Sequence, residues 1–399
     1  MSKSSADFIP ERVVNLDAAR LRYGAKADRM AEMATVGDPL ADAVIAELDE
    51  LGKEGRRILN AGLEAGLAQL GEEPPPGIKA FLDELEAVPS WVDPEMLDRG
   101  EVVTHSVPGL WFEIAMITSA LTHTYSSPAI ARLLVQTGQL TKMAPRRLIE
   151  TGLWTMSATQ PGGLHRGAAG YIATAQVRLL HARVRASALK HSWDSAVWGT
   201  PISQVDVART WLDFTLTPSR AFSSIGIDFT LEEQQQRYAY WSYLAYLLGL
   251  DPFFYQDIKD DEDGGRLQDL LDSTTAPPDD DARALTGAMI EAQSESLAMR
   301  PDALMDKEQY RDLVHGLLRR TFGDEHADRL GIPRSAVAHM LPVVSLMNNQ
   351  SRRWQTFTPE SKAAALAENA SGAPTPELME FLVPGGTAYA RNINESTPA

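Results

Sequence analysis

One histidine, His181, stands between two arginines at helical spacing. It lies in the segment YIATAQVRLLHARVRASA, residues 171–188, which has good helix formers and neither Gly nor Pro. Helical spacing puts Arg178 one turn before the histidine and Arg185 one turn after it, on the same stripe. An imidazole can ligate iron and guanidinium groups bind carboxylates, so the stripe could hold a haem through its iron and its two propionates. The pattern alone favours a plainer interpretation, a surface helix whose arginines meet solvent.

Other residues could contact the same cofactor. Thr174 and Val177 lie on the stripe itself, two turns and one turn before His181. Trp211, with Phe214 three residues further on, could line the pocket, although aromatic residues at helical spacing are more often part of a core. The remaining histidines have no His or Glu at the spacing of a zinc motif, so we expect no zinc site.

The composition limits the classes of function. The chain has 399 residues, with 37 Lys and Arg against 54 Asp and Glu, and a net charge of −17, which disfavours nucleic acid and anionic lipid surfaces as partners. It has no cysteine, which excludes disulfides, iron–sulfur clusters and thiolate ligation of haem. No apolar window is long enough for a membrane span. Because no apolar stretch follows the charged N-terminus, no secretory signal is visible and we expect the cytoplasm.

The periodicity of apolar residues predicts an all-α fold. They recur mostly at helical spacing, and alternating runs of β-branched residues are scarce. Residues 38–66 illustrate this, because an Asp-Pro start is followed by apolar residues that lean to one side. The Pro-rich stretch 72–80 predicts a corner within one domain. We expect an N-terminal arm over 1–37, a single large helical domain over 38–384, and a flexible C-terminal tail over 385–399.

Three blocks of sequence resemble latex clearing proteins and their wider family, which includes the oxygenase that cuts the farnesyl side chain in mycophenolic acid biosynthesis. The blocks are TAQVRLLHARVR at 174–185, PSWVDPEMLDRG at 89–100 and PISQVDVARTW at 201–211, and they occur in the family's order. The resemblance implies a globin-like haem-binding core with extra peripheral helices. It also implies haem b, with His181 as the proximal ligand and both neighbouring arginines holding the haem environment, through the propionates.

The resemblance also implies a distal helix before the proximal one. Counting back from His181 at the family's spacing reaches Arg147, Glu150 and Thr151 in RRLIETGLW. The arginine and the threonine match the family, but Glu150 stands where relatives carry a lysine. Rubber-cleaving relatives also carry an acidic residue upstream, and the matching stretch 126–134 has none. Either Glu150 replaces that residue as the base, or the chemistry is not rubber cleavage. The same residues also fit a solvated helix end whose arginines pair with acids.

Together, these expectations predict that the protein is a haem b-dependent oxygenase. It would act with dioxygen on a small, apolar, unsaturated molecule of isoprenoid or lipid type, with oxidative cleavage of a C=C bond as one outcome. Three alternatives stay open: a peroxidase or peroxygenase on the same haem, a non-catalytic haem protein that binds or senses gas, and a helical scaffold without haem. The sequence sets no oligomeric state.

Overall fold

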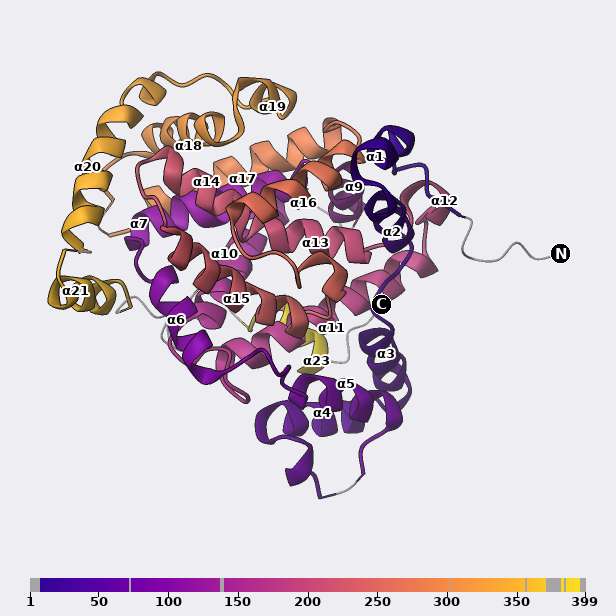
Figure 1. Ribbon diagram of the computed structural model, residues 1–399. Coiled ribbons are helices and arrows are strands. Elements are labelled where there is room, and N and C mark those ends of the chain that lie inside the picture. The colour runs from indigo at the N-terminus through magenta and orange to yellow at the C-terminus, as the bar shows by residue number, and fades with distance from the viewer. Residues whose placement is uncertain are drawn as a thin grey trace.

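The protein is built from helices, as the apolar periodicity predicts (Figure 1). The computed structural model describes residues 8–71, 73–136, 140–301, 303–355, 357–370, 382–383 and 385–394. Within these residues the only β-bridge is an isolated one between Val13 and Thr275, so the prediction of a single large all-α domain is confirmed. None of the described helices is long and apolar enough to cross a membrane.

The bounds of the elements are as follows. The helices are α1 (Leu16–Tyr23), α2 (Ala25–Met33), α3 (Pro39–Leu51), α4 (Lys53–Ala65), α5 (Pro76–Glu86), α6 (Pro94–Thr104), α7 (Gly109–Trp111), α8 (Thr118–Tyr125), α9 (Pro128–Gln136), α10 (Leu140–Thr159), α11 (Ala169–Lys190), α12 (Ser195–Trp198), α13 (Gln204–Asp213), α14 (Leu216–Ser224), α15 (Leu231–Leu247), α16 (Asp261–Ser273), α17 (Asp280–Ala298), α18 (Lys307–Phe322), α19 (Asp324–Arg329), α20 (Leu341–Gln355), α21 (Pro359–Ala370) and α23 (Ala388–Asn394). Short 3-10 turns are η2 (Leu67–Gln69), η4 (Pro252–Phe254) and η5 (Ala336–His339), and η3 (Phe112–Ile117) is a π-helical stretch between α7 and α8.

Local sequence signals set where several helices begin. Asp38 accepts a hydrogen bond from the backbone N–H of Ala41, and Pro39 follows it as the first residue of α3. Asp93 caps α6 in the same way. Ser203 begins α13 with a capping box, in which its side chain and that of the third residue exchange hydrogen bonds with the backbone. These caps satisfy N–H groups that would otherwise lack partners at buried helix ends.

The N-terminal segment packs into the core. Met30 and Met33 of α2 are almost fully buried, and Arg12 forms an ion pair of 2.5 Å with Asp206 of α13. α3, α4 and α5 lie together at the lower edge of the molecule in Figure 1, where α3 contacts α11. Residues of this segment thus contact the core where it is described, and the N-terminal arm expected over 1–37 and the limits of the domain stay predictions.

The described part of the C-terminal segment contains a short helix, α23. Within the described part, α23 packs mainly against α11 and also against α4. Its Tyr389 is buried, and desolvation raises the pKa of this side chain to about 12. Residues 385–394 thus contain a helix that packs on the rest of the chain, the flexible tail expected over 385–399 stays a prediction, and residues 395–399 lie outside the described residues.

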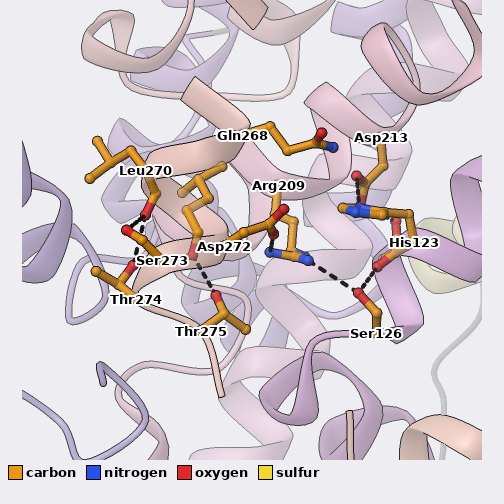
Figure 2. A network of polar contacts seen from close by, with 12 residues as sticks. His123, Ser126, Arg209, Asp213, Gln268, Leu270, Asp272, Ser273, Thr274 and Thr275 are labelled. Carbon is orange, nitrogen blue, oxygen red and sulfur yellow. Dashed lines mark hydrogen bonds and ion pairs between the residues drawn. The ribbon is translucent and has the colours of Figure 1, made fainter. Parts of the chain in front are cut away.

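A buried polar network joins α8, α13 and α16 (Figure 2). His123 Nδ1 lies 2.6 Å from Asp213 Oδ1, and Arg209 donates to Ser126 Oγ at 3.1 Å. Arg209 also forms an ion pair of 2.8 Å with Asp272. Arg209 belongs to the block 201–211 that resembles the family, so at least this residue of the block serves the fold.

Gly100 allows the close approach of α6 and α15, so Gly100→Ala should destabilise the protein. A Cβ at this position would lie 2.4 Å from Tyr240 Cβ, and Tyr240 is fully buried. We expect a loss of about 1–3 kcal/mol in the free energy of unfolding, measured by denaturant titration. The control is Gly287→Ala in α17, where nothing lies near the new methyl group; it should gain about 0.5–1 kcal/mol. Equal effects of the two substitutions would contradict this packing.

Candidate functional site: the α10–α11 hairpin

α10 and α11 form an antiparallel hairpin that carries all the candidate site residues except Trp211, which lies on α13. Trp154 Nε1 of α10 donates to Thr174 Oγ1 of α11 at 3.1 Å. Nearer the connection, Gly170 lies so close to α10 that a Cβ would be 2.3 Å from the Ser157 carbonyl oxygen. Both pairs follow one antiparallel register. Continuing that register for two more turns brings Arg147 of α10 to the level of His181 on α11.

His181 lies deep in the protein without a hydrogen-bond partner. Desolvation, and next to it the positive charge of Arg185, lowers the pKa of the imidazole to about 4. By its accessible surface, however, the residue is intermediate, so part of it is not covered by the chain. In the part of the chain that the structure describes, no hydrogen bond reaches this ring. The imidazole is therefore neutral at neutral pH, and its unprotonated nitrogen has a lone pair that a metal ion could bind.

The two arginines beside His181 are held by carboxylates of the N-terminal helices. Arg178 is almost fully buried and donates to Asp38 through Nε at 2.6 Å and Nη2 at 3.0 Å, and to Glu84 through Nη1 at 2.6 Å. Arg185 donates to Asp42 at 2.9 Å and to the carbonyl of Ile202 at 2.8 Å. These pairs attach α11 to α3 and α5.

The two arginines differ in whether an N–H group is still available to a cofactor. Every nitrogen of the Arg178 guanidinium already has a carboxylate partner. Arg185 Nη2, by contrast, is buried and has no acceptor among the described residues. A buried N–H group without an acceptor is costly, so this is a place where an anionic group of a ligand would be stabilised. Arg185 thus fits a haem carboxylate better than Arg178 does.

The residues expected on the distal side all lie on α10. Arg147 Nη2 donates to the carbonyl of Leu134 at 3.1 Å, and Thr151 is half-buried. Glu150 is buried, and its Oε1 accepts hydrogen bonds from Arg146 Nε at 2.9 Å and from the backbone N–H of Ala388 at 2.8 Å. Glu150 therefore holds the first turn of α23 against α10.

The three remaining residues that were expected to contact the cofactor lie either on α11 or in the packed core. Val177 is partly buried on α11, and Thr174 is fully buried between the two helices. Trp211 lies in the packed core, where its Nε1 donates to the carbonyl of Trp241 at 2.7 Å. This supports the plainer interpretation of Trp211 as a core residue. In the described part of the chain, no three His, Asp or Glu side chains come together so that they could hold a metal ion.

The sequence analysis missed the carboxylates that bind the arginines. Asp38 and Asp42 lie four residues apart, on one face of α3, and Arg178 and Arg185 lie seven apart on one face of α11. Two acidic residues on one face of a helix and two basic residues on one face of another could have indicated ion pairs between the helices. Nothing in the local sequence, however, showed that these two helices meet. No comparable pattern around Glu84 indicated its ion pair with Arg178.

The comparisons with known proteins agree with this arrangement. Residues 108–349 match the sequence model of a family described as "ER-bound oxygenase mpaB/B'/Rubber oxygenase, catalytic domain", and the match includes both α10 and α11. Among solved structures, the chain is similar to latex clearing protein LCP in the closed state, with a TM-score of 0.63 and 18% sequence identity, over 85% of this chain and 91% of that chain. At this identity the likeness shows a shared fold. No curated protein matches the chain.

Asp38→Asn should destabilise the protein strongly, because it removes charge from the buried pair with Arg178. Asparagine still caps a helix, so the cap of α3 survives and the effect reports the ion pair. We expect a loss of about 3 kcal/mol in the free energy of unfolding, by thermal or denaturant unfolding. Asp49→Asn on the same helix is the control, because its pair with Arg183 is half exposed; it should cost less than about 1 kcal/mol. Similar losses for the two variants would refute a structural role for the buried pair.

Proposed function

Because the chain belongs to the family of mpaB-type and rubber oxygenase catalytic domains, we propose that it is a haem b-dependent oxygenase that acts with dioxygen on an apolar, unsaturated, isoprenoid- or lipid-like molecule. Membership makes the chain an oxidoreductase of the oxygenase type. The haem, its ligand and the substrate class are the proposal. One observation carries it: His181 is a deep, neutral imidazole with no hydrogen-bond partner among the described residues, at the level of Arg147 on the facing helix.

The residues of α11 would hold the haem. His181 would bind the iron, and the Arg185 Nη2 group, which has no acceptor among the described residues, would bind a propionate. Val177 would contact the porphyrin face, and Thr174 would keep the two helices in register. Arg178 would act through the position of α11, since its own donors are taken by Asp38 and Glu84. Bound haem would supply the binding and activation of dioxygen.

The residues of α10 would act on the other side of the substrate space. The Arg147 guanidinium would stabilise negative charge that develops there, and the Thr151 hydroxyl would orient a polar atom by hydrogen bonding. Glu150 would accept a proton through Oε2, because Oε1 already binds Arg146 and the N–H of Ala388 and no hydrogen bond to Oε2 is present among the described residues. The burial of Glu150 would exclude water from this step. The cytoplasmic location stays a prediction.

His181→Ala should lose the pigment of the protein. Haem without its protein ligand binds weakly, so the purified variant should lack the Soret absorption band that we expect of the wild type. His191→Ala is the control: this histidine follows the end of α11 and its ring binds only the carbonyl of Ser187, at 2.7 Å. It should keep its full haem content. A haem content in His181→Ala equal to that of the wild type would overturn the ligand assignment.

Labelled dioxygen should distinguish an oxygenase from the alternative haem proteins. We expect the haem-loaded protein to convert a neutral polyene such as squalene under ¹⁸O₂ without added peroxide. If a C=C bond is cleaved, one labelled atom should enter each of the two new carbonyl groups, as mass spectrometry would show. Turnover that needs peroxide and proceeds without dioxygen would instead mean a peroxidase or peroxygenase. Reversible dioxygen binding with no loss of any olefin would mean a gas-binding protein.

A further inference from the structure

Trp154 lies on the same side of α10 as the residues expected on the distal side. It follows Thr151 by three residues and Arg147 by seven, which is the spacing of one helix face. Its Nε1 group donates to Thr174 Oγ1 on α11 at 3.1 Å, two turns before His181. An easily oxidised indole thus lies on the hairpin that carries the candidate site.

From Trp154, aromatic residues lead in an unbroken row to the surface of the protein. The ring centroids of Trp154 and Trp241, on α15, are 6.3 Å apart. Trp211 on α13 donates from Nε1 to the carbonyl of Trp241 at 2.7 Å, and its ring centroid lies 6.5 Å from that of Tyr255. The ring of Tyr255 in turn lies 6.4 Å from that of Trp91, in the turn before α6. We call these five residues the aromatic path.

The aromatic path is buried except at its outer end. Its four inner residues are at most 7% exposed, whereas Trp91 is 44% exposed. Indole is among the side chains that lose one electron most easily, and electrons tunnel readily between rings that are this close. Because the inner rings are shielded from water, an electron hole on them has few partners for side reactions. A row of rings that ends at an exposed indole can therefore carry electrons inward from the surface.

We propose that the aromatic path transfers single electrons from the surface to the haem site, so that haem oxidised in the absence of substrate is reduced again. The inference rests on the proposed function, because the oxidant is haem that has reacted with a peroxide. Trp154 would give one electron to the oxidised haem, and the electron hole would pass along the path to Trp91 with no bond broken. The ring of Tyr255 would serve as a bridge between two indoles, so its phenolic proton stays in place.

The path is restored at its exposed end. Trp91 would release its indole proton to water once the electron hole reaches it. A soluble one-electron reductant such as ascorbate would then return the electron, and water would return the proton. One turn of the path thus consumes one electron from the reductant and reduces the haem by one electron.

Oxidation mapping of the haem-loaded, full-length protein tests the path. The probe is hydrogen peroxide, added without substrate in the presence of a spin trap, and mass spectrometry then locates the trapped radicals. Wild type should carry the adduct at Trp91 and far less of it at Trp354, which is 68% exposed and lies outside the path. An oxidant that diffused through the solvent would instead label the more exposed Trp354 at least as strongly. This comparison needs no variant to fold.

Trp211→Phe should interrupt the path, because phenylalanine is far harder to oxidise than tryptophan. We expect the adduct at Trp91, measured per bound haem, to fall to the level of Trp354. The matched control is Trp193→Phe. Trp193 is also buried and donates from Nε1 to a backbone carbonyl, at 2.8 Å, but its ring packs on Trp198, outside the path. The control should keep the wild-type yield at Trp91.

Equal labelling of Trp354 and Trp91 in the wild type would overturn the proposal. The same holds if Trp211→Phe keeps as much label at Trp91 as its control does. A haem-loaded wild type in which Trp91 stays unlabelled would overturn the path alone. A wild type without a Soret band would refute the proposed haem and, because the path would then have no oxidant, this inference with it.

Discussion

The pairing of two buried guanidinium groups with carboxylates of α3 and α5 fixes the position of α11, and the candidate site depends on it. A buried charge that loses its partner costs about 3–5 kcal/mol, which is a large part of the stability of an ordinary domain. Separation of Arg178 from Asp38 would therefore be strongly destabilising, whereas the pair of Arg185 with Asp42 is worth less, because the Asp42 side chain is 41% exposed. α11, which carries His181, is consequently held in place by α3 and α5, two helices that are far from it in the sequence.

His181 stays neutral because it is desolvated, and the charge of Arg185 favours the same protonation state. Desolvation has the largest effect on the pKa of His181, the Arg185 charge acts in the same direction, and Asp38 partly opposes both. The charges near the ring are thus largely compensated within the protein, and burial decides its protonation. A neutral imidazole at a fixed position is what axial ligation of iron requires. The same constraint leaves Arg185 with one donor group for a further anion.

Local patterns predicted the helices, but not their partners. The run without Gly or Pro predicted a helix over 171–188, and α11 spans Ala169–Lys190. The Asp-Pro start predicted α3 because a cap is a local interaction. The partner of Arg178 lies 140 residues away in the sequence, and no periodicity encodes such a pairing. The order of α23 depends likewise on Glu150, far from it in the chain.

The most direct test of the central claim is the absorption spectrum of His181→Gly, recorded with and without added imidazole. Removing the side chain should leave a space that free imidazole can fill. We predict a variant with little or no Soret absorption when it is mixed with haem alone, and a wild-type-like spectrum, with stoichiometric haem, once imidazole is present. A variant that binds haem with the wild-type spectrum in the absence of imidazole would contradict the assignment of His181 as the iron ligand.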